Sequence, residues 1–378
     1  MSSTIPCLIQ LNGDNVAANL LPIMALKPER IVQIVTKSQR AERAVAQFKE
    51  VFTLLAKEKG YEGYKPRIQD HTVSSGSMPD VRDNIARLLL ENPGSVVNFS
   101  GGSKLMSVGA YQAALALGRP SLFCDVEEQR FVDGQTGHLP SPPAYDTLAK
   151  QFSMSLLMAL SGRKLDEWKA STPNDSLRTF GLRAYELRLQ HWNAMESFNQ
   201  SLRTALPNLG DKPLPQAVTQ SEAARLYLSA ASSAGLVRQG NDGWRIATGQ
   251  NHAAHLLTDG WLELAVLDRI LVNPSYREVM WNPSREGSDT GRGIFLIDSR
   301  SMKLRYFECL PTLRNSPQDH VEAVAQRARE LGGSSAEAVL VVLRPAQGQE
   351  NTIRHAARRI GAEVVLGAEE VTKRFARG

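Results

Sequence analysis

Residues 96–106 read VVNFSGGSKLM, and this stretch decides how the first third of the chain is interpreted. A short apolar run, typical of a buried strand, ends in two glycines, after which a serine and a lysine open a helical pattern. Glycine lets the backbone pass close to a ligand, and the amino end of a helix presents unpaired N–H groups to an anion. Lys104 adds a positive charge beside them. The stretch therefore predicts a loop that binds a phosphate-bearing ligand.

The spacing of this loop differs from two common nucleotide-binding motifs. It is neither GxxxxGK[ST], the loop of P-loop NTPases, nor GxGxxG, the fingerprint of dinucleotide-binding domains. The spacing of the loop therefore argues against a function in ATP hydrolysis or NAD binding. A tight turn with an exposed lysine accounts for the bare GGSK pattern as readily as a ligand site does.

The segments around the loop alternate between β-branched runs and amphipathic helical patterns. Five such runs predict strands, at residues 7–11, 30–36, 65–73, 95–100 and 121–126. Their alternation with helices predicts an open parallel sheet with helices on both faces, which is a Rossmann-like α/β fold. The GGSK loop then follows a central strand at its carboxyl end, where open α/β sheets bind ligands.

The remainder of the chain changes pattern twice. Turn residues and a proline pair within residues 130–146 predict a hairpin followed by a linker. We therefore expect a Rossmann-like ligand-binding domain at 1–145, a helical linker with a winged-helix-like module at 146–250, and a second α/β domain at 251–378.

The winged-helix-like module is predicted from a helix followed by a hairpin pattern. Thr219 and Glu222 have capping-box spacing ahead of an apolar-periodic run that stops at Gly235. A DNA-reading module needs a helix rich in lysine and arginine, whereas this one offers Arg225 among alanine, serine and leucine. We interpret it as a structural spacer, with nucleic-acid contact as the alternative.

Composition sets broad limits on partners and compartment. The net charge of +5 permits a DNA or RNA partner without requiring one. Cys7, Cys124 and Cys309 each lie in an apolar run, which favours reduced core thiols and a cytoplasmic location. The chain has neither an apolar run of membrane-spanning length nor the start of a secretory signal, so we expect no membrane partner.

The string NFSGGSKLM at 98–106 resembles the N-(L/F)-(T/S)-G-G-T/S-K-x-M signature of CARF domains in CRISPR-associated nucleases activated by cyclic tetra-adenylate. Three further segments match that family: residues 12–23, the strand that ends at Thr36, and residues 260–263. The resemblance covers most of the chain, including its order of CARF domain, winged-helix-like connector and restriction-endonuclease-like α/β domain of the PD-(D/E)XK type.

The resemblance implies a homodimer that senses a cyclic oligoadenylate in type III CRISPR antiviral defence. A two-fold ligand suits a pocket built from two copies of one domain, and no cofactor is required for binding. The matching ligand-binding residues are Asn98, Ser100, Gly101, Gly102, Ser103 and Lys104, with Asn12, Asn15, Thr36 and Ser38 as weaker candidates on neighbouring loops. Asn15 and Thr36 would serve equally well as helix caps.

In the C-terminal domain the resemblance implies a nuclease site that is incomplete in this chain. Carboxylates of such sites hold Mn²⁺ or Mg²⁺, and a lysine supports the attacking water. Glu263 and Glu308 match the two glutamates, but Leu310 stands at the lysine position. No carboxylate lies at 290–295, where the aspartate is expected.

The predicted hairpin places the remaining carboxylates. With a turn near 299–301, Glu308 faces roughly Arg292, and an ion pair between them would replace the metal. Asp298 would then lie about 20 Å along the strand, too far to share a metal with Glu308. Asp289 is closer, in a loop rich in serine and glycine. Installing Asp at 293 and Lys at 310 would restore the motif in this register.

Two classes of output remain open. The chain is either a ligand-gated effector or a non-catalytic regulator that controls DNA or protein binding, and the missing lysine and aspartate favour the regulator. An active DNA or RNA endonuclease would need a relocated carboxylate together with Mn²⁺ or Mg²⁺. A ligand-cleaving domain would use Ser100 and Lys104. We expect no other metal site.

Overall fold

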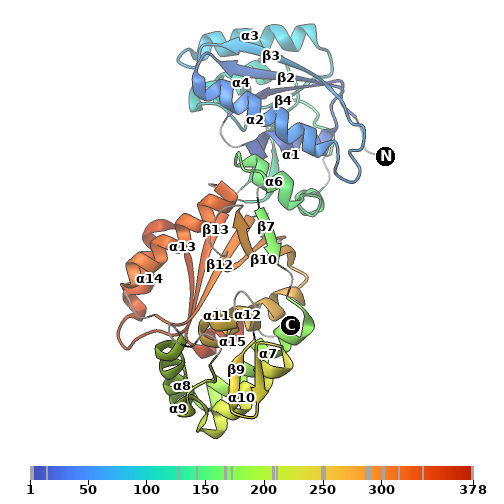
Figure 1. The fold of residues 1–378 in the computed structure, drawn as a ribbon. Helices are drawn as coiled ribbons and strands as arrows, with labels where there is room; N and C mark the ends of the chain where they lie inside the picture. Colours follow the sequence, from blue (N-terminus) through green and yellow to red (C-terminus); the bar gives the residue numbers. More distant parts are fainter. Residues whose placement is uncertain are drawn as a thin grey trace. The chain divides into compact units, whose positions relative to one another are not determined.

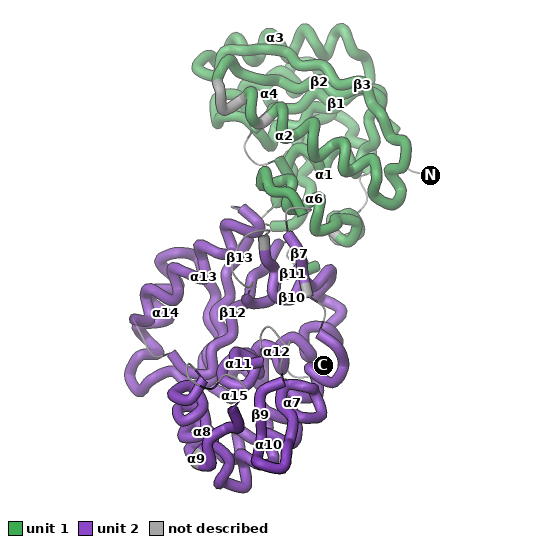
Figure 2. Tube along the Cα trace, viewed as in Figure 1, with its two compact units in different colours: residues 1–165, 299–302 green, residues 166–298, 303–378 purple. Residues whose placement is uncertain are grey.

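The structure is a computed structural model whose chain divides into two units (Figure 2). One unit comprises residues 1–165 and 299–302, and the other comprises 166–298 and 303–378. The residues described are 4–13, 16–126, 128–141, 144–165, 168–171, 173–206, 209, 212–247, 253–285, 292–299, 303–313, 316–333 and 336–375.

The first unit is built on a six-stranded sheet in the order β3-β2-β1-β4-β5-β6 (Figure 1). Its strands are β1 (Cys7–Leu11), β2 (Arg30–Thr36), β3 (Arg67–Val73), β4 (Val96–Asn98), β5 (Ser121–Asp125) and β6 (Arg130–Asp133). The first five are parallel, and β6 returns antiparallel along β5. The predicted Rossmann-like sheet is confirmed.

Helices cover both faces of this sheet. They are α1 (Val16–Leu26), α2 (Gln39–Leu55), α3 (Met78–Glu91) and α4 (Lys104–Ala116). Two shorter helices pack on these: α5 (Tyr145–Ala149) contacts α1, and α6 (Met154–Leu160) contacts α2. Ile9, Val32 and Val97 form a row across three strands and share a core with α3 and α4. Asn98 points to the other face, where its side chain bonds to the Ala18 carbonyl of α1. This alternation is what a strand's two-residue period requires.

The second unit holds a mixed sheet in the order β14-β13-β12-β11-β10-β7. Its strands are β7 (Trp168–Ser171), β10 (Tyr276–Arg285), β11 (Ile294–Asp298), β12 (Lys303–Thr312), β13 (Ala336–Arg344) and β14 (Glu363–Leu366). The predicted β11–β12 hairpin is confirmed, and β12, β13 and β14 are parallel. Strand β7 was not expected, because four residues within a segment of helical pattern give no periodic signal.

The described residues of the second unit also form ten helical segments. They are α7 (Asp175–Gln190), α8 (Trp192–Ala205), α9 (Gln216–Thr219), α10 (Glu222–Ser233), α11 (Ala253–His255), the π-helical turn η3 (Leu256–Gly260), α12 (Trp261–Leu271), α13 (Pro317–Gly332), α14 (Glu350–Ile360) and α15 (Ala368–Arg374). One hydrophobic core joins Phe180 of α7 and Tyr227 of α10 to Trp281 and Phe307 of the sheet. Residues 166–250 therefore share a core with the C-terminal strands, and the three-domain division stays a prediction.

Helix α10 is followed by a hairpin of β8 (Val237–Gly240) and β9 (Gly243–Ile246), as the sequence predicted. Its description as a winged-helix-like module stays a prediction. The predicted capping residue is wrong, because Ser221 Oγ accepts from the Ala224 amide at 3.0 Å. Thr219 donates instead to the Gln216 carbonyl in α9. Ser221 has the extended backbone that a cap requires, directly before the first helical residue.

Within the described residues, no helix combines the length and apolar character needed to span a bilayer.

Candidate functional site

The GGSK loop lies at the point where the strand order of the first unit's sheet reverses. Strands β1 and β4 are neighbours, and the chain continues to β2 on one side and to β5 on the other. Loops at such a point diverge and leave room for a ligand at the carboxyl edge of the sheet. The loops that follow β1 and β4 are both at this edge.

The glycines of the loop are needed for its close packing against the end of β1. A Cβ on Gly101 would lie 2.1 Å from the Leu11 carbonyl oxygen, and one on Gly13 would lie 2.7 Å from the Gly102 nitrogen. Gly102 has a φ of +75°, a left-handed conformation that favours glycine. The two glycines therefore set the path of the loop, and a side chain at Gly101 would push it away from β1.

Asn98 and Ser100 fix the start of the loop through hydrogen bonds. Asn98 donates to the Ala18 carbonyl at 3.1 Å and accepts from both the amide and the hydroxyl of Ser100. The Ser100 hydroxyl also accepts from the Cys124 amide of β5 at 2.6 Å. The polar groups of these two candidates are thus used within the unit, where they tie β4 to α1 and β5.

Ser103 and Lys104 are exposed at the carboxyl edge of the sheet, at the amino end of α4. Ser103 is exposed and caps α4, since its Oγ accepts from the Met106 amide at 3.3 Å. Lys104 is exposed at the first position of the helix, and the first turn has no acidic side chain. The amino end of α4 therefore presents N–H groups and a positive charge together, which suits an anion.

The weaker candidates lie beside this helix end. Thr36 and Ser38 line a groove of about 460 Å³ between the carboxyl ends of β2 and β3, together with Lys37, Thr72, Val73, Ser74, Ser75 and Asp80. The Ser103 hydroxyl lies 3.5 Å from the Ser75 carbonyl oxygen, so the groove adjoins the start of α4. The sequence reading missed the loop after β3, although its run SSGS at 74–77 is typical of a polar turn. Asn15 lies outside the described residues.

Asn12 is half-buried and adjoins a row of buried amides beneath the carboxyl edge of the sheet. Its side chain donates to Gln33 Oε1 at 3.2 Å, and Asn19 donates to it at 3.5 Å. Gln33, Gln10 and Asn98 are fully buried and lie side by side on β2, β1 and β4. The signal for this row was a glutamine in the middle of each of the two apolar runs CLIQL and RIVQIVT.

Glu263 in the second unit is buried and fully hydrogen-bonded. Its side chain is 3% exposed, and its oxygens accept from the indole of Trp281 at 2.6 Å and from the Gly293 amide at 3.1 Å. Burial, the largest cause, and the nearby charge of Glu308 raise the pKa of Glu263 to about 7, against the lowering effect of these two bonds and of Arg292. The two N–H donors thus offset only part of the cost of burying the charged carboxylate.

Glu308 faces Gly293, one residue from the predicted Arg292. Asp298 pairs with Lys303 and Ile294 with Phe307, and extending this register by one residue beyond the end of β11 places Gly293 opposite Glu308. The shift arises because four residues, not three, separate the paired ends of the hairpin. No ion pair joins Arg292 to Glu308 in the part of the chain that the structure describes, so this expectation is wrong.

Other groups surround Glu308 in place of that ion pair. The Tyr306 hydroxyl lies 2.9 Å from the Arg292 carbonyl oxygen and 3.5 Å from Glu308 Oε2. Arg327 of α13 lies close by: partial burial lowers its pKa, but the hydrogen bond with Tyr306 and the charge of Glu308 raise it overall. A guanidinium from another element thus accompanies Glu308, on a strand where residue 310 is leucine.

No further carboxylate joins this pair among the described residues. Gly293 has a φ of +87°, and a Cβ there would lie 2.5 Å from the Phe307 carbonyl oxygen. Asp298 lies five residues along β11, about 17 Å away at the usual strand rise, and its side chain forms an ion pair with Arg305 at 3.0 Å. Asp289 lies outside the described residues, within which no group of three His, Cys, Asp or Glu side chains gathers.

The raised pKa of Glu263 predicts a particular pH dependence of stability. Between the ordinary glutamate pKa of 4.5 and the folded value of about 7, the unfolded chain releases a proton that the folded chain keeps. The free energy of unfolding should therefore fall as the pH rises through this window, by up to about 3 kcal/mol from this group. Urea unfolding at pH 5 and pH 8 should show that fall reduced by this amount in Glu263→Gln.

The exposed Glu186→Gln variant is the matched control and should keep the pH dependence of the parent. An equal fall in the parent and in Glu263→Gln would mean that Glu263 ionises as an ordinary glutamate.

Comparisons with known proteins agree on the fold. No protein-family model matches the sequence, and no curated protein matches it. The structure is similar to that of Can2 from Sulfobacillus thermosulfidooxidans in complex with cyclic tetra-adenylate, with a TM-score of 0.70, 15% identity and coverage of 97% of this chain and 96% of that one. It is also similar to protein VC1899 from Vibrio cholerae, with a TM-score of 0.71, 14% identity and coverage of 97% and 95%. The chain therefore shares their fold over nearly its whole length.

Proposed function

We propose that this chain is a receptor for a cyclic oligoadenylate, cyclic tetra-adenylate in the first place, in type III CRISPR antiviral defence. One observation carries the proposal: the exposed amino end of α4, with Lys104 and the two glycines, lies at the switch point of a sheet whose fold is shared with a cyclic tetra-adenylate complex. The groove beside it is lined by hydroxyl groups and by Lys37. Such a surface suits the phosphates and riboses of an oligonucleotide ring.

A homodimer would complete the pocket. Leu105, Val108 and Leu115 are 49%, 46% and 53% exposed, and their heptad-like spacing places them on one face of α4. Because α4 begins with the GGSK loop, pairing this face with its copy about a two-fold axis that runs along the helices would bring the two loops together. A two-fold axis there matches the symmetry of a four-nucleotide ring.

For the output we favour regulation without cleavage. Glu263 is held by Trp281 and Gly293, Glu308 lies beside Tyr306 and Arg327, and residue 310 is leucine. The two carboxylates thus already have hydrogen-bonding or charged neighbours, and within the described residues no third His, Cys, Asp or Glu side chain gathers with them. The ligand would then control binding of DNA, RNA or protein by the second unit. No cofactor is needed for this, and Mn²⁺ or Mg²⁺ would matter only to an active nuclease.

Isothermal titration calorimetry with cyclic tetra-adenylate and cyclic hexa-adenylate tests the receptor. We expect one ring per two chains and preference for one ring size, and chromatography should recover the ring intact. The linear tetra-adenylate is the control, because it carries the same bases without the closed two-fold ring. Absence of binding by either ring would refute the proposal, and one ring per chain would refute the shared pocket.

A further inference from the structure

A π-helical turn directly precedes the helix that carries Glu263. The turn η3 spans Leu256–Gly260, and α12 begins at Trp261. A π turn adds one residue to a helical turn and leaves backbone groups without their usual partners, so it persists only where its surroundings stabilise it. Relaxation to a regular α-helix would rotate α12 by about 100° relative to the segment before the turn.

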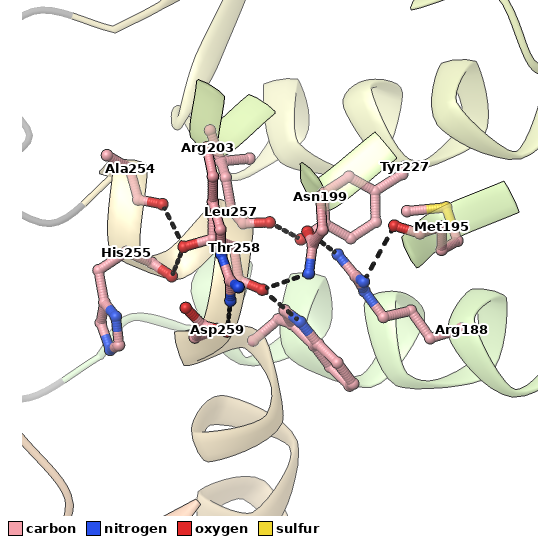
Figure 3. Close-up of polar contacts among 11 residues, drawn as sticks. Arg188, Met195, Asn199, Arg203, Tyr227, Ala254, His255, Leu257, Thr258 and Asp259 are labelled. Carbon is pink, nitrogen blue, oxygen red and sulfur yellow. Dashed lines mark hydrogen bonds and ion pairs between the residues drawn. The ribbon is translucent and has the colours of Figure 1, made fainter. Parts of the chain in front are cut away.

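Side chains of two other helices bond the carbonyls of this turn (Figure 3). The Tyr227 hydroxyl of α10 donates to the Leu257 carbonyl at 2.7 Å, and the Asn199 amide of α8 donates to the Thr258 carbonyl at 2.9 Å. The Trp261 indole donates to the same Thr258 carbonyl at 3.2 Å. Three side chains therefore bond carbonyls of the turn, two of them from the helices α8 and α10, and Arg203 of α8 also pairs with the side chain of Asp259 in the turn.

Arg188 of α7 joins these three side chains to one another. Its guanidinium carbon lies 5.2 Å from the ring centre of Tyr227 and 4.8 Å from that of Trp261, and its Nη2 donates to Asn199 Oδ1 at 2.6 Å. A second bond goes to the Met195 carbonyl at 3.3 Å. Figure 3 shows the guanidinium among these groups.

The burial of Arg188 is costly and calls for a role. Its side chain is 1% exposed, and among the described residues no carboxylate forms an ion pair with it. Two aromatic rings and neutral acceptors compensate for the lost hydration only in part. A methionine would fill similar space in this core without that cost. That substitution would, however, remove the contacts by which Arg188 links Asn199, Tyr227 and Trp261.

We propose that Arg188 is a positioning residue which, through Asn199, Tyr227 and Trp261, holds the π turn and thereby aims Glu263 at Trp281 and Gly293. Glu263 lies two residues after Trp261, so the rotation of α12 set by the turn also sets the direction of its carboxylate. Helices α7, α8 and α10 thus determine the geometry of the C-terminal carboxylate pocket. The inference rests on contacts within the second unit and does not depend on the proposed ligand.

The test uses the full chain labelled with 5-fluorotryptophan and observed by ¹⁹F NMR. The five tryptophans can be assigned by single substitutions to phenylalanine. In Arg188→Met we expect the Trp261 and Trp281 resonances to shift while those of the other tryptophans stay in place. Amide hydrogen exchange over residues 257–264 should accelerate at least tenfold. Arg188→Lys, which keeps the cation between the two rings, should restore the Trp281 resonance in part.

Arg178→Met is the matched control. Arg178 also lies on α7 and pairs with Asp268 of α12 at 3.3 Å, so its loss removes a link between the same two helices away from the turn. Its Trp281 resonance should match the parent's. An unchanged Trp281 resonance in folded Arg188→Met would overturn the proposal.

Tyr227→Phe provides a second test if Arg188→Met does not fold. It removes only the hydroxyl that bonds the Leu257 carbonyl, so the core should stay packed. We expect faster exchange at the turn and a shift of the Trp281 resonance. Exchange and resonance both equal to the parent's would show that the turn does not depend on these helices, and would overturn the proposal as well.

Discussion

Replacing Lys104 by alanine should weaken the binding of cyclic tetra-adenylate at least a hundredfold. Lys104 is exposed at the amino end of α4, where its ammonium group and the helix N–H groups face the same edge of the sheet. A charge-assisted contact to phosphate contributes about 1.5–3 kcal/mol. Because the proposed pocket holds two copies of the residue, the loss should be about 3–6 kcal/mol, which exceeds a hundredfold in Kd.

Calorimetry on the parent and on the Lys104→Ala variant measures this effect. Lys57→Ala is the matched control, since it removes an equal charge from an exposed position just after α2, the helix that starts at the ligand edge and runs away from it. It should bind as the parent does. If Lys104→Ala also binds as the parent does, Lys104 is an ordinary surface lysine and the pocket lies elsewhere.

Nuclease activity of the unmodified protein should not exceed that of Glu308→Ala, even with cyclic tetra-adenylate and Mn²⁺ present. Two carboxylates without a third ligand and without a supporting lysine seldom form a hydrolytic site. Here Glu263 already accepts two hydrogen bonds, and Glu308 lies beside Tyr306 and Arg327. A working site of this type would exceed the variant by orders of magnitude.

The assay compares plasmid and single-stranded substrates with and without ligand and metal. Ligand-dependent cutting that Glu308→Ala abolishes would show that another group completes the site. Gly293→Asp does not provide a positive control, although it restores the expected motif. Its Cβ would collide with the Phe307 carbonyl at a backbone conformation that suits glycine, so we expect misfolding of the hairpin instead of activity.

The parallel sheet of the first unit and the place of its GGSK loop could be predicted from the amino-acid sequence. Alternating apolar runs and helical patterns are local signals, and the five parallel strands of the sheet could be recognised from their own residues. Strand β6 was expected in a hairpin within residues 130–146 and pairs instead with β5. The two glycines before Ser103 could also be read locally, because a turn of that kind needs them wherever it occurs. The leucine at position 310, where the resembled family has a lysine, could be read directly from the sequence.

The contacts of individual side chains could be identified only in the folded chain. Ser100 bonds to β5, Glu308 faces Gly293, and Arg188 lies between rings that are 39 and 73 residues further along the chain. A strand pattern specifies which residues alternate but leaves the register with its neighbour open by a residue, and that single step separated Gly293 from Arg292. Side-chain partners depend on such registers and on helix packing between distant segments. No local pattern records them, because the contacts exist only once the chain has folded.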